Sequence, residues 1–148
     1  MFDKDKLKTE LIHFEGYRNK VYLDTTGRLT GGIGHLIEPN DGVWTEGEQI
    51  DEVVIDSWYC ADSQTAIQRT EQILGQSTWN EIDSFRQRVL VQIVFNLGYN
   101  FTQFRQTINC IHNLDWEGAS QNLMNSEWYN QVGIRGELTC NALINGQY

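Results

Sequence analysis

Two carboxylates and a hydroxyl stand near the start of the chain in an order that suits acid and base chemistry. Glu15 is followed nine positions later by Asp24, which opens an Asp-Thr-Thr-Gly stretch, and Thr30 comes just beyond. Cleavage of a glycosidic bond needs one carboxylic acid to protonate the leaving oxygen and a second carboxylate across the sugar to steer water or stabilise positive charge. Glu15 and Asp24 are therefore candidates for these two roles.

Each of these residues also has an ordinary structural interpretation. Glu15 could be a solvated carboxylate at a helix end, Asp24 could be an Asx-turn residue, and Thr30 could be a β-branched strand residue. Catalysis by Glu15 requires a poorly hydrated site that raises the pKa of its carboxyl group toward the working pH. His35 is expected to pair structurally with Asp56 or Asp62 instead of acting as a catalytic base.

A longer pattern surrounds the three candidates. Residues 15–35 read E-G-x5-Y-x-D-x-x-G-x-x-T-x-G-x-G-H, which resembles the T4-type phage lysozymes, a family of peptidoglycan muramidases. Two weaker segments support the resemblance: Val-Phe-Asn-Leu-Gly at 94–98, and Trp-Tyr-Asn-Gln at 128–131 followed by Arg135. The resemblance extends from roughly residue 5 to roughly residue 140, and residues 36–80 match only in outline.

The resemblance implies both an activity and a set of roles. The implied reaction is hydrolysis of the β-1,4 bond between N-acetylmuramic acid and N-acetylglucosamine, with inversion at the anomeric carbon. Glu15 would protonate the leaving oxygen, while Asp24 and Thr30 would position the attacking water. The resemblance implies no metal or cofactor.

Three further residues are implied to bind substrate: Asn96, Arg135 and Gly34. Asn96 would offer both a donor and an acceptor to an N-acetyl group, and Arg135 would also orient Glu15. A polar residue near a helix end and a plain surface arginine remain the alternatives for Asn96 and Arg135. Four aromatic residues are more readily assigned to the core than to sugar platforms: Tyr22, Phe95, Trp128 and Tyr129.

Local patterns predict a small sheet after a first helix. Asp3 or Asp5 can cap a helix that carries apolar residues at helical spacing and ends at Glu15-Gly16. Short strands are predicted over 20–23, over 28–30 and from Ile33 onward, with glycines between them. Gly31 and Gly32 stand where the family often has one large apolar residue and then glycine, so Thr30 is expected to be held less firmly.

The remainder of the chain reads as helical. A loop over 36–44 leads to Thr45-Glu46-Gly47-Glu48, which has the form of a capping box before a long helix to Gly75, with a break near Asp62-Ser63 as an option. Ser77 or Thr78 would open an apolar core helix over 79–97. Further helices are predicted over 101–112, 116–125 and 134–143, and Asp115 is expected to cap the second of these.

These elements predict an α+β fold in one domain, 1–148, and the resemblance implies that this fold is lysozyme-like. A small N-terminal antiparallel β lobe, approximately 12–60, would be joined by a long helix to a larger, mainly helical C-terminal lobe, approximately 1–11 with 61–148. A chain of 148 residues can bury about two-thirds of its unfolded surface, and 11% aromatic residues supply core material.

Charge and cysteine content narrow the function class. The net charge is −9, and no lysine follows Lys20, which argues against a nucleic-acid partner. Many lysozymes of this family are basic, so this acidic chain departs from them. The three cysteines show no metal-binding spacing and are expected to pack as small buried thiols, with a Cys110–Cys140 disulfide as the alternative.

The expected setting follows from the absence of certain segments in the sequence. There is no apolar run of 18 residues and no apolar segment after the N-terminal lysines, so a monomer made in a host cytoplasm without a signal peptide or membrane insertion is expected. Its partner would be the glycan strands of peptidoglycan, reached through a holin or a phage tail. Two alternatives are a tail- or effector-associated lysozyme domain whose acidic lobe docks a partner, and a wall-binding module without turnover.

Overall fold

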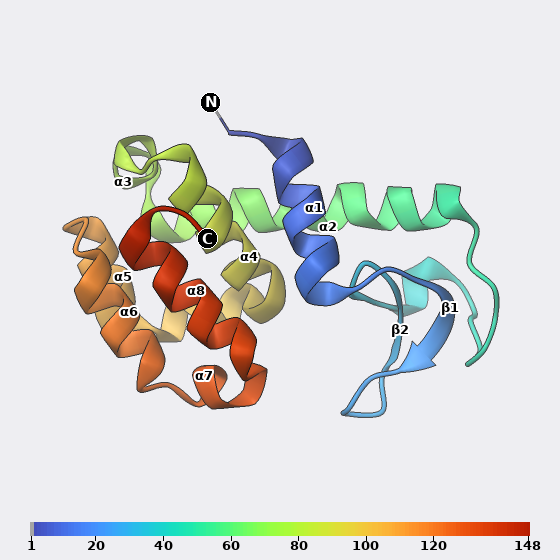
Figure 1. The fold of residues 1–148 in the computed structure, drawn as a ribbon. Coiled ribbons are helices and arrows are strands. Elements are labelled where there is room, and N and C mark those ends of the chain that lie inside the picture. The colour runs from blue at the N-terminus through green and yellow to red at the C-terminus, as the bar shows by residue number, and fades with distance from the viewer. Residues whose placement is uncertain (1) are drawn as a thin grey trace. The chain divides into compact units, whose positions relative to one another are not determined.

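The computed structural model describes residues 2–148 and separates into two compact units. The first unit is Asp5–Thr65, and the second is Ala66–Tyr148 together with residues 2–4. Figure 1 shows a short sheet in the first unit and bundled helices in the second. The predicted α+β fold is confirmed.

Helix α1, Lys4–Glu15, opens the first unit. Leu7 and Leu11, one turn apart, are fully buried, so one face of the helix is turned away from solvent. The helix ends as predicted, because Gly16 takes φ 82° and its N–H donates to the Ile12 carbonyl at 2.8 Å. Glu15 is consequently its last residue.

Three antiparallel strands follow in the order β1-β2-β3, with bounds Arg18–Leu23, Leu29–Gly32 and His35–Leu36. Thr30 lies opposite Tyr22 on one side and Leu36 on the other. The β1·β2 register shifts between Arg18 and Tyr22, so the hairpin is irregular at its open end. The central strand β2 thus carries Thr30 at the middle of the sheet.

The segment from 45 to 48 is a turn and not the start of a helix, so that part of the prediction is wrong. Glu48 does accept from the Thr45 N–H at 3.1 Å, as in a capping box. The following backbone, however, pairs with β1: the Gly47 N–H donates to the Val21 carbonyl at 2.8 Å. These groups cannot also form helical hydrogen bonds, so α2 begins only at Glu52.

Helix α2, Glu52–Leu74, is continuous, and no break occurs at Asp62-Ser63. The Ser63 hydroxyl donates within the helix to the Cys60 carbonyl at 3.3 Å, and the Asp62 carboxylate contacts His35. Both polar side chains are satisfied without opening the helix. The short 3₁₀ helix η1, Pro39–Asp41, lies in the loop before it.

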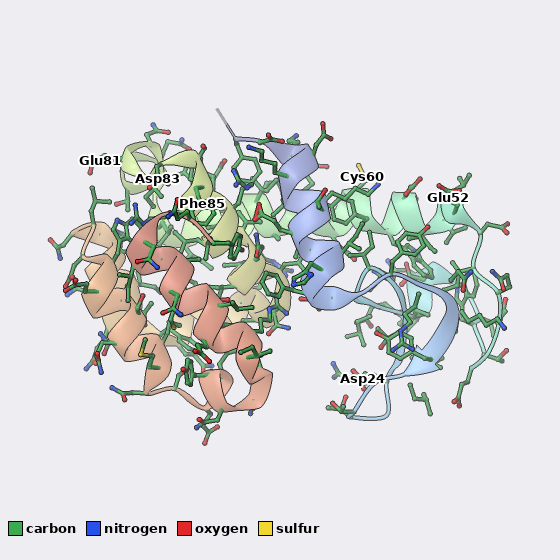
Figure 2. The ribbon with its side chains drawn as sticks, viewed as in Figure 1. Asp24, Glu52, Cys60, Glu81, Asp83 and Phe85 are labelled. Atoms are coloured by element: carbon green, nitrogen blue, oxygen red, sulfur yellow. The ribbon has the colours of Figure 1, made fainter. Side chains whose placement is uncertain are left out.

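The second unit has two helices where a single one over 79–97 was predicted. These are α3, Gln76–Glu81, and α4, Ser84–Leu97. Asp83 separates them, because its carboxylate accepts from the Arg86 N–H at 2.9 Å and caps α4. Figure 2 marks Glu81, Asp83 and Phe85 around this break. A fully buried stretch of α4, 88–94, forms the centre of this unit.

The remaining elements follow α4 along the chain, and η2 and α8 contact it. They are the 3₁₀ helix η2, Gly98–Gln103, and helices α5, Arg105–His112; α6, Trp116–Met124; α7, Glu127–Val132; and α8, Ile134–Asn145. Helix α8 packs against α4, α6 and α7. Asp115 caps α6 as predicted, accepting from the Gly118 N–H at 3.0 Å. Phe101 falls in η2, so α5 starts later than predicted.

The three cysteines are free, which excludes the alternative of a disulfide between Cys110 and Cys140. Cys140 is buried and its thiol lies 3.7 Å from the Ser120 carbonyl, as expected for a small core residue. Cys60 is exposed on α2, contrary to the expectation of burial, and Figure 2 shows its sulfur at the helix surface. Among residues 2–148, no helix is long and apolar enough to cross a membrane.

Candidate active site

The Glu15 side chain is confined by the turn between β2 and β3. Gly34 in this turn has φ +60°, and a Cβ placed on it would lie 2.9 Å from Glu15 Oε2 and 3.0 Å from Glu15 Cβ. The close approach requires a residue without a side chain, and the positive φ favours the same residue. Gly34, predicted to bind substrate, is therefore placed directly against the candidate acid.

Asp24 occupies the turn between β1 and β2, and Figure 2 labels it there. Its Oδ1 atom accepts three hydrogen bonds, from the Thr26 N–H at 2.8 Å, the Thr26 hydroxyl at 2.7 Å and the Arg28 N–H at 2.9 Å. The Asp24 carbonyl also accepts from the Gly27 N–H at 3.0 Å. Asp24 is thus a true Asx-turn residue as well as a candidate for chemistry.

These hydrogen bonds favour the ionised form of the Asp24 carboxyl group. The Arg28 N–H is the main cause, with the Thr26 hydroxyl next, and together they lower the pKa of the Asp24 carboxyl below its usual value. Asp24 is accordingly ionised in neutral and mildly acidic solution. Within residues 2–148 its hydrogen bonds all go to Oδ1, which leaves Oδ2 with its lone pairs for an incoming molecule.

Thr30 is connected to Asp24 through the backbone of Arg28. The Thr30 hydroxyl donates to the Arg28 carbonyl at 3.0 Å, and the N–H of the same Arg28 donates to Asp24 Oδ1. Thr30 is only 6% exposed, so its hydroxyl has few orientations open to it. Its proton is engaged, and its oxygen lone pairs are what it can offer to a water molecule.

Tyr22 lies within electrostatic reach of both carboxylates. Burial raises the pKa of its hydroxyl, Arg18 opposes that shift, and the negative charges of Glu15 and Asp24 each add to it. The Arg18 guanidinium lies 4.7 Å from the centre of the Tyr22 ring. The Tyr22 hydroxyl therefore senses the charges of both carboxylates.

Gly31 does not leave a gap in the central strand. It is buried and pairs with His35, and a Cβ placed on it would overlap Ile50 Cδ1. The Trp58 ring would lie 3.6 Å away. These two side chains occupy the space that a large apolar residue at 31 would need, so the strand next to Thr30 is packed on this face.

His35 is held between two carboxylates and a ring. Its Nδ1 lies 2.7 Å from Asp62 and its Nε2 lies 2.9 Å from Asp41, while the ring stacks on Trp58 with centroids 4.4 Å apart. Burial on its own would lower the pKa of His35, but the hydrogen bonds and charges of Asp62 and Asp41 outweigh it and raise the pKa. With both nitrogens engaged, His35 is structural.

The predicted partner Asp62 is therefore confirmed, and Asp41 is an addition. The other predicted partner, Asp56, is wrong because its carboxylate instead lies 3.5 Å from the Lys8 ammonium. No group of three or more His, Cys, Asp or Glu side chains within residues 2–148 is arranged to hold a metal ion.

The second unit holds Asn96 and Arg135. Trp128 Nε1 donates to Asn96 Oδ1 at 2.9 Å, which fixes the amide so that its NH₂ group remains for another acceptor. Arg135 Nη2 lies 3.4 Å from the Gln92 carbonyl. A hollow of about 810 Å³ opens beside Trp128. Its lining is rich in amides and includes two aromatic rings: Leu97, Asn100, Gln103, Phe104, Arg105, Gln106, Asn122, Asn125, Ser126, Glu127, Trp128 and Gln131.

Comparison with known proteins gives a match over most of the chain. The family model described as phage lysozyme matches residues 12–145. The chain belongs to the phage lysozyme family. The matched segment contains all six predicted site residues, from Glu15 to Arg135.

Relatives of this phage lysozyme family member come from two kinds of organism. "Probable T4-type lysozyme 2" of Dictyostelium discoideum is 30% identical over 95% of this chain and 94% of its own length, and "Probable T4-type lysozyme 1" of the same amoeba is 28% identical over the same shares. "Peptidoglycan hydrolase gp36" of Pseudomonas phage phiKMV is 26% identical over 88% of this chain, which corresponds to 14% of that longer protein.

Sequence reasoning did not predict two features that the structure places beside the candidate residues of this family member. The first is the hollow beside Trp128, whose amides come from four separate elements and leave no local motif. The second is Tyr22, which was assigned to the core. A signal for Tyr22 was present, because it stands two residues before Asp24 and on the strand that had to pair with Thr30.

Proposed function

We propose that this chain is a lysozyme-type peptidoglycan hydrolase that cuts the β-1,4 bond between N-acetylmuramic acid and N-acetylglucosamine. Glu15 is the general acid, and Asp24 with Thr30 positions water. One observation carries the proposal. The same short sheet positions both groups: Asp24 Oδ1 and the Thr30 hydroxyl of β2 are joined through the Arg28 backbone, and Glu15 packs against Gly34 in the turn that follows β2. One small region therefore supplies an ionised carboxylate and a second carboxyl group.

The geometry supports a division of labour between the two residues. In the reaction, Glu15 transfers its proton to the leaving glycosidic oxygen as the bond to the anomeric carbon breaks. A water molecule donates one hydrogen bond to Asp24 Oδ2 and another to the Thr30 oxygen, attacks the anomeric carbon from the opposite face, and loses its proton to Asp24. Attack from that face inverts the configuration.

Substrate binding is part of the same proposal. Asn96 offers its NH₂ group to an N-acetyl carbonyl, Arg135 offers a guanidinium, and Gly34 offers backbone close to the acid. The amide-rich hollow of about 810 Å³ in the second unit accommodates further parts of the peptidoglycan. Its Trp128 side wall is held in place by the hydrogen bond to Asn96.

Product analysis of digested peptidoglycan tests the proposal. Wild-type protein should release new reducing ends at muramic acid, of inverted configuration when first formed. Glu15→Gln and Asp24→Asn should each lower the initial rate by about 10²–10⁴-fold while the circular dichroism spectrum is retained. Glu46→Gln, an exposed carboxylate of the same unit, is the matched control and should keep the full rate. Full activity of Glu15→Gln would remove the proposal.

A second candidate is a lysozyme domain that works as part of a larger assembly, such as a phage tail or an effector. The match to 14% of a longer phage hydrolase favours it, because a domain of this kind exists there within a larger protein. The relatives from an amoeba and a phage carry a lysozyme or hydrolase name, although they come from different kinds of organism. Size-exclusion chromatography separates a free monomer from a chain that associates with partners in lysate.

A further inference from the structure

A second hollow lies in the first unit, apart from the candidate catalytic residues. It measures about 260 Å³ and has a floor formed by Ile50 and Ile55, which are 2% and 1% exposed. Tyr17 forms part of its wall and is 43% exposed. None of its lining residues is Glu15, Asp24 or Thr30. Figure 2 shows Glu52, which lines this hollow, well separated from Asp24.

Backbone pairing builds this hollow and leaves its polar side chains free. The Ile50 N–H donates to the Asn19 carbonyl at 2.7 Å, and Gln49 bridges to Lys20. The Asp51 carbonyl then accepts from the Val54 and Ile55 N–H groups in the first turn of α2. The backbone is therefore fixed, whereas four rim side chains make no hydrogen bond or ion pair within residues 2–148: Asn19, Gln49, Asp51 and Glu52.

The composition of the hollow indicates its ligand. Apolar side chains and an exposed tyrosine ring suit the C–H face of a sugar, while amides and carboxylates suit its hydroxyl and amino groups. The volume lies below the range of about 300–1,000 Å³ usual for sites that take drug-sized ligands, so one sugar ring fits and an oligosaccharide does not. Two carboxylates with no ion-pair partner in the described chain disfavour an anionic ring.

We propose that this hollow is a non-catalytic subsite for one hexosamine ring of a glycan, either uncharged or carrying a free amine. The choice of a glycan rests on the proposed function, although the chemistry of the hollow stands apart from it. A subsite away from the reacting bond would hold a neighbouring strand or a distant part of the same strand. The protein would then remain attached to an insoluble wall between cleavage events.

Amide NMR of the Glu15→Gln variant tests the subsite without turnover. The probes are the trimer of N-acetylglucosamine, which is uncharged, and the trimer of glucosamine, which carries amines. Either trimer should cause saturable shifts of the Asn19, Gln49 and Asp51 backbone amides. Tyr17→Ala should weaken this binding at least 10-fold, whereas Tyr17→Phe should keep it because the ring remains.

The carboxylates at the rim of the hollow allow a second, independent test of the subsite. The double variant Asp51→Asn, Glu52→Gln should weaken the glucosamine trimer more than the N-acetylglucosamine trimer. No shift at these amides with either trimer, or shifts that Tyr17→Ala leaves unchanged, would overturn the subsite. If Tyr17→Ala does not give a folded spectrum, Asn19→Ala takes its place.

The two proposals fail separately. If the proposed function is wrong, wild-type protein will release no reducing ends from peptidoglycan. The binding experiment does not measure this release. If the subsite proposal is wrong, wild-type protein can still release reducing ends from soluble fragments of peptidoglycan. Wild type and Tyr17→Phe should also be retained longer than Tyr17→Ala on an insoluble glucosamine polymer.

Discussion

Single residues hold the two candidate carboxylates by different physical means. Asp24 is fixed by hydrogen bonds from residues two and four positions later, so its geometry is encoded locally. Glu15 is confined by Gly34, which is distant in sequence and reaches it only after the sheet has formed. A local motif could therefore predict the Asp24 turn, whereas the contact on Glu15 depends on packing.

The contact between Gly34 and Glu15 predicts a position-specific loss of activity. In Gly34→Ala the new Cβ would lie 2.9 Å from Glu15 Oε2, so the carboxylate must shift. A misplacement approaching 1 Å costs about 10²-fold in rate, and kcat on peptidoglycan should fall by about 10–100-fold. KM should change less, because the displaced group acts on the reacting bond.

Gly47→Ala is the matched control for Gly34→Ala. Gly47 has φ +86° and nothing within 4 Å of a Cβ built on it, so the substitution adds backbone strain without a clash at Glu15. Both variants should lose about 1–2 kcal/mol of unfolding free energy. If Gly47→Ala loses as much kcat as Gly34→Ala, backbone strain and not contact with Glu15 explains the effect.

The cysteines predict an order of chemical modification. Burial raises the pKa of the Cys140 thiol to about 11, so at pH 8 only about one molecule in a thousand carries the reactive thiolate. Cys60 is exposed on α2. Iodoacetamide at pH 8 should label Cys60 before Cys140, as measured by peptide mass, and urea should make Cys140 reactive. Equal labelling rates in the folded protein would contradict the burial of Cys140.

At the level of elements, the side chain of His35 connects β3 to α2 and η1. Its two nitrogens contact Asp62 of α2 and Asp41 of η1, and its ring stacks on Trp58. The sequence left Asp56 and Asp62 as equal candidates, and both fall on α2. Which carboxylate faces β3 depends on where α2 begins and how it is rotated about its axis. Because the 45–48 turn was predicted to begin this helix, the sequence did not give its true start.

The contacts of His35 with Asp62 and Asp41 predict a free energy of unfolding that depends on pH. The folded pKa of His35 is raised above its unfolded value of about 6.5, so the stabilisation is complete below about pH 6.5 and is lost as the pH rises through the folded pKa. Asp62→Asn should lower the free energy of unfolding by about 1.5–3 kcal/mol at pH 5.5 and by less at pH 9. Urea denaturation at both pH values measures the difference.

Asp56→Asn is the control on the same helix. Its ion pair with Lys8 joins side chains that are 52% and 40% exposed, so the cost should be about 0–1 kcal/mol and should not change between pH 5.5 and pH 9. An Asp62→Asn variant whose destabilisation is the same at both pH values would show that the charge of His35 does not contribute.

Element boundaries were predicted well where one residue decides them and poorly where two patterns compete. Gly16 and Asp115 end and begin helices as predicted. The break at Asp83 was missed because apolar residues on both sides continue one helical pattern, and only the capping hydrogen bond to the Arg86 N–H reveals it. The Thr45–Glu48 motif formed its local bonds, yet pairing with β1 used the backbone that a helix would need.

For the whole molecule, the net charge can be read most directly from the sequence. The fold class follows from the order of the predicted helices and strands. The net charge is −9, and residues 36–68 contain eight acidic residues and no Lys or Arg. Charge is independent of packing, so it could be predicted in full. The two hollows could not, because side chains distant in sequence form each of them.

The charge predicts that salt accelerates action on a cell wall. An acidic protein and an anionic wall repel one another, and raising the salt from 0.01 M to 0.15 M shortens the Debye length from about 30 Å to about 8 Å. The initial rate of peptidoglycan hydrolysis should therefore rise by severalfold over this range, as measured by loss of turbidity. A rate on peptidoglycan that falls with salt would mean that the cationic groups near the N-terminus, and not the net charge, govern the encounter with the wall.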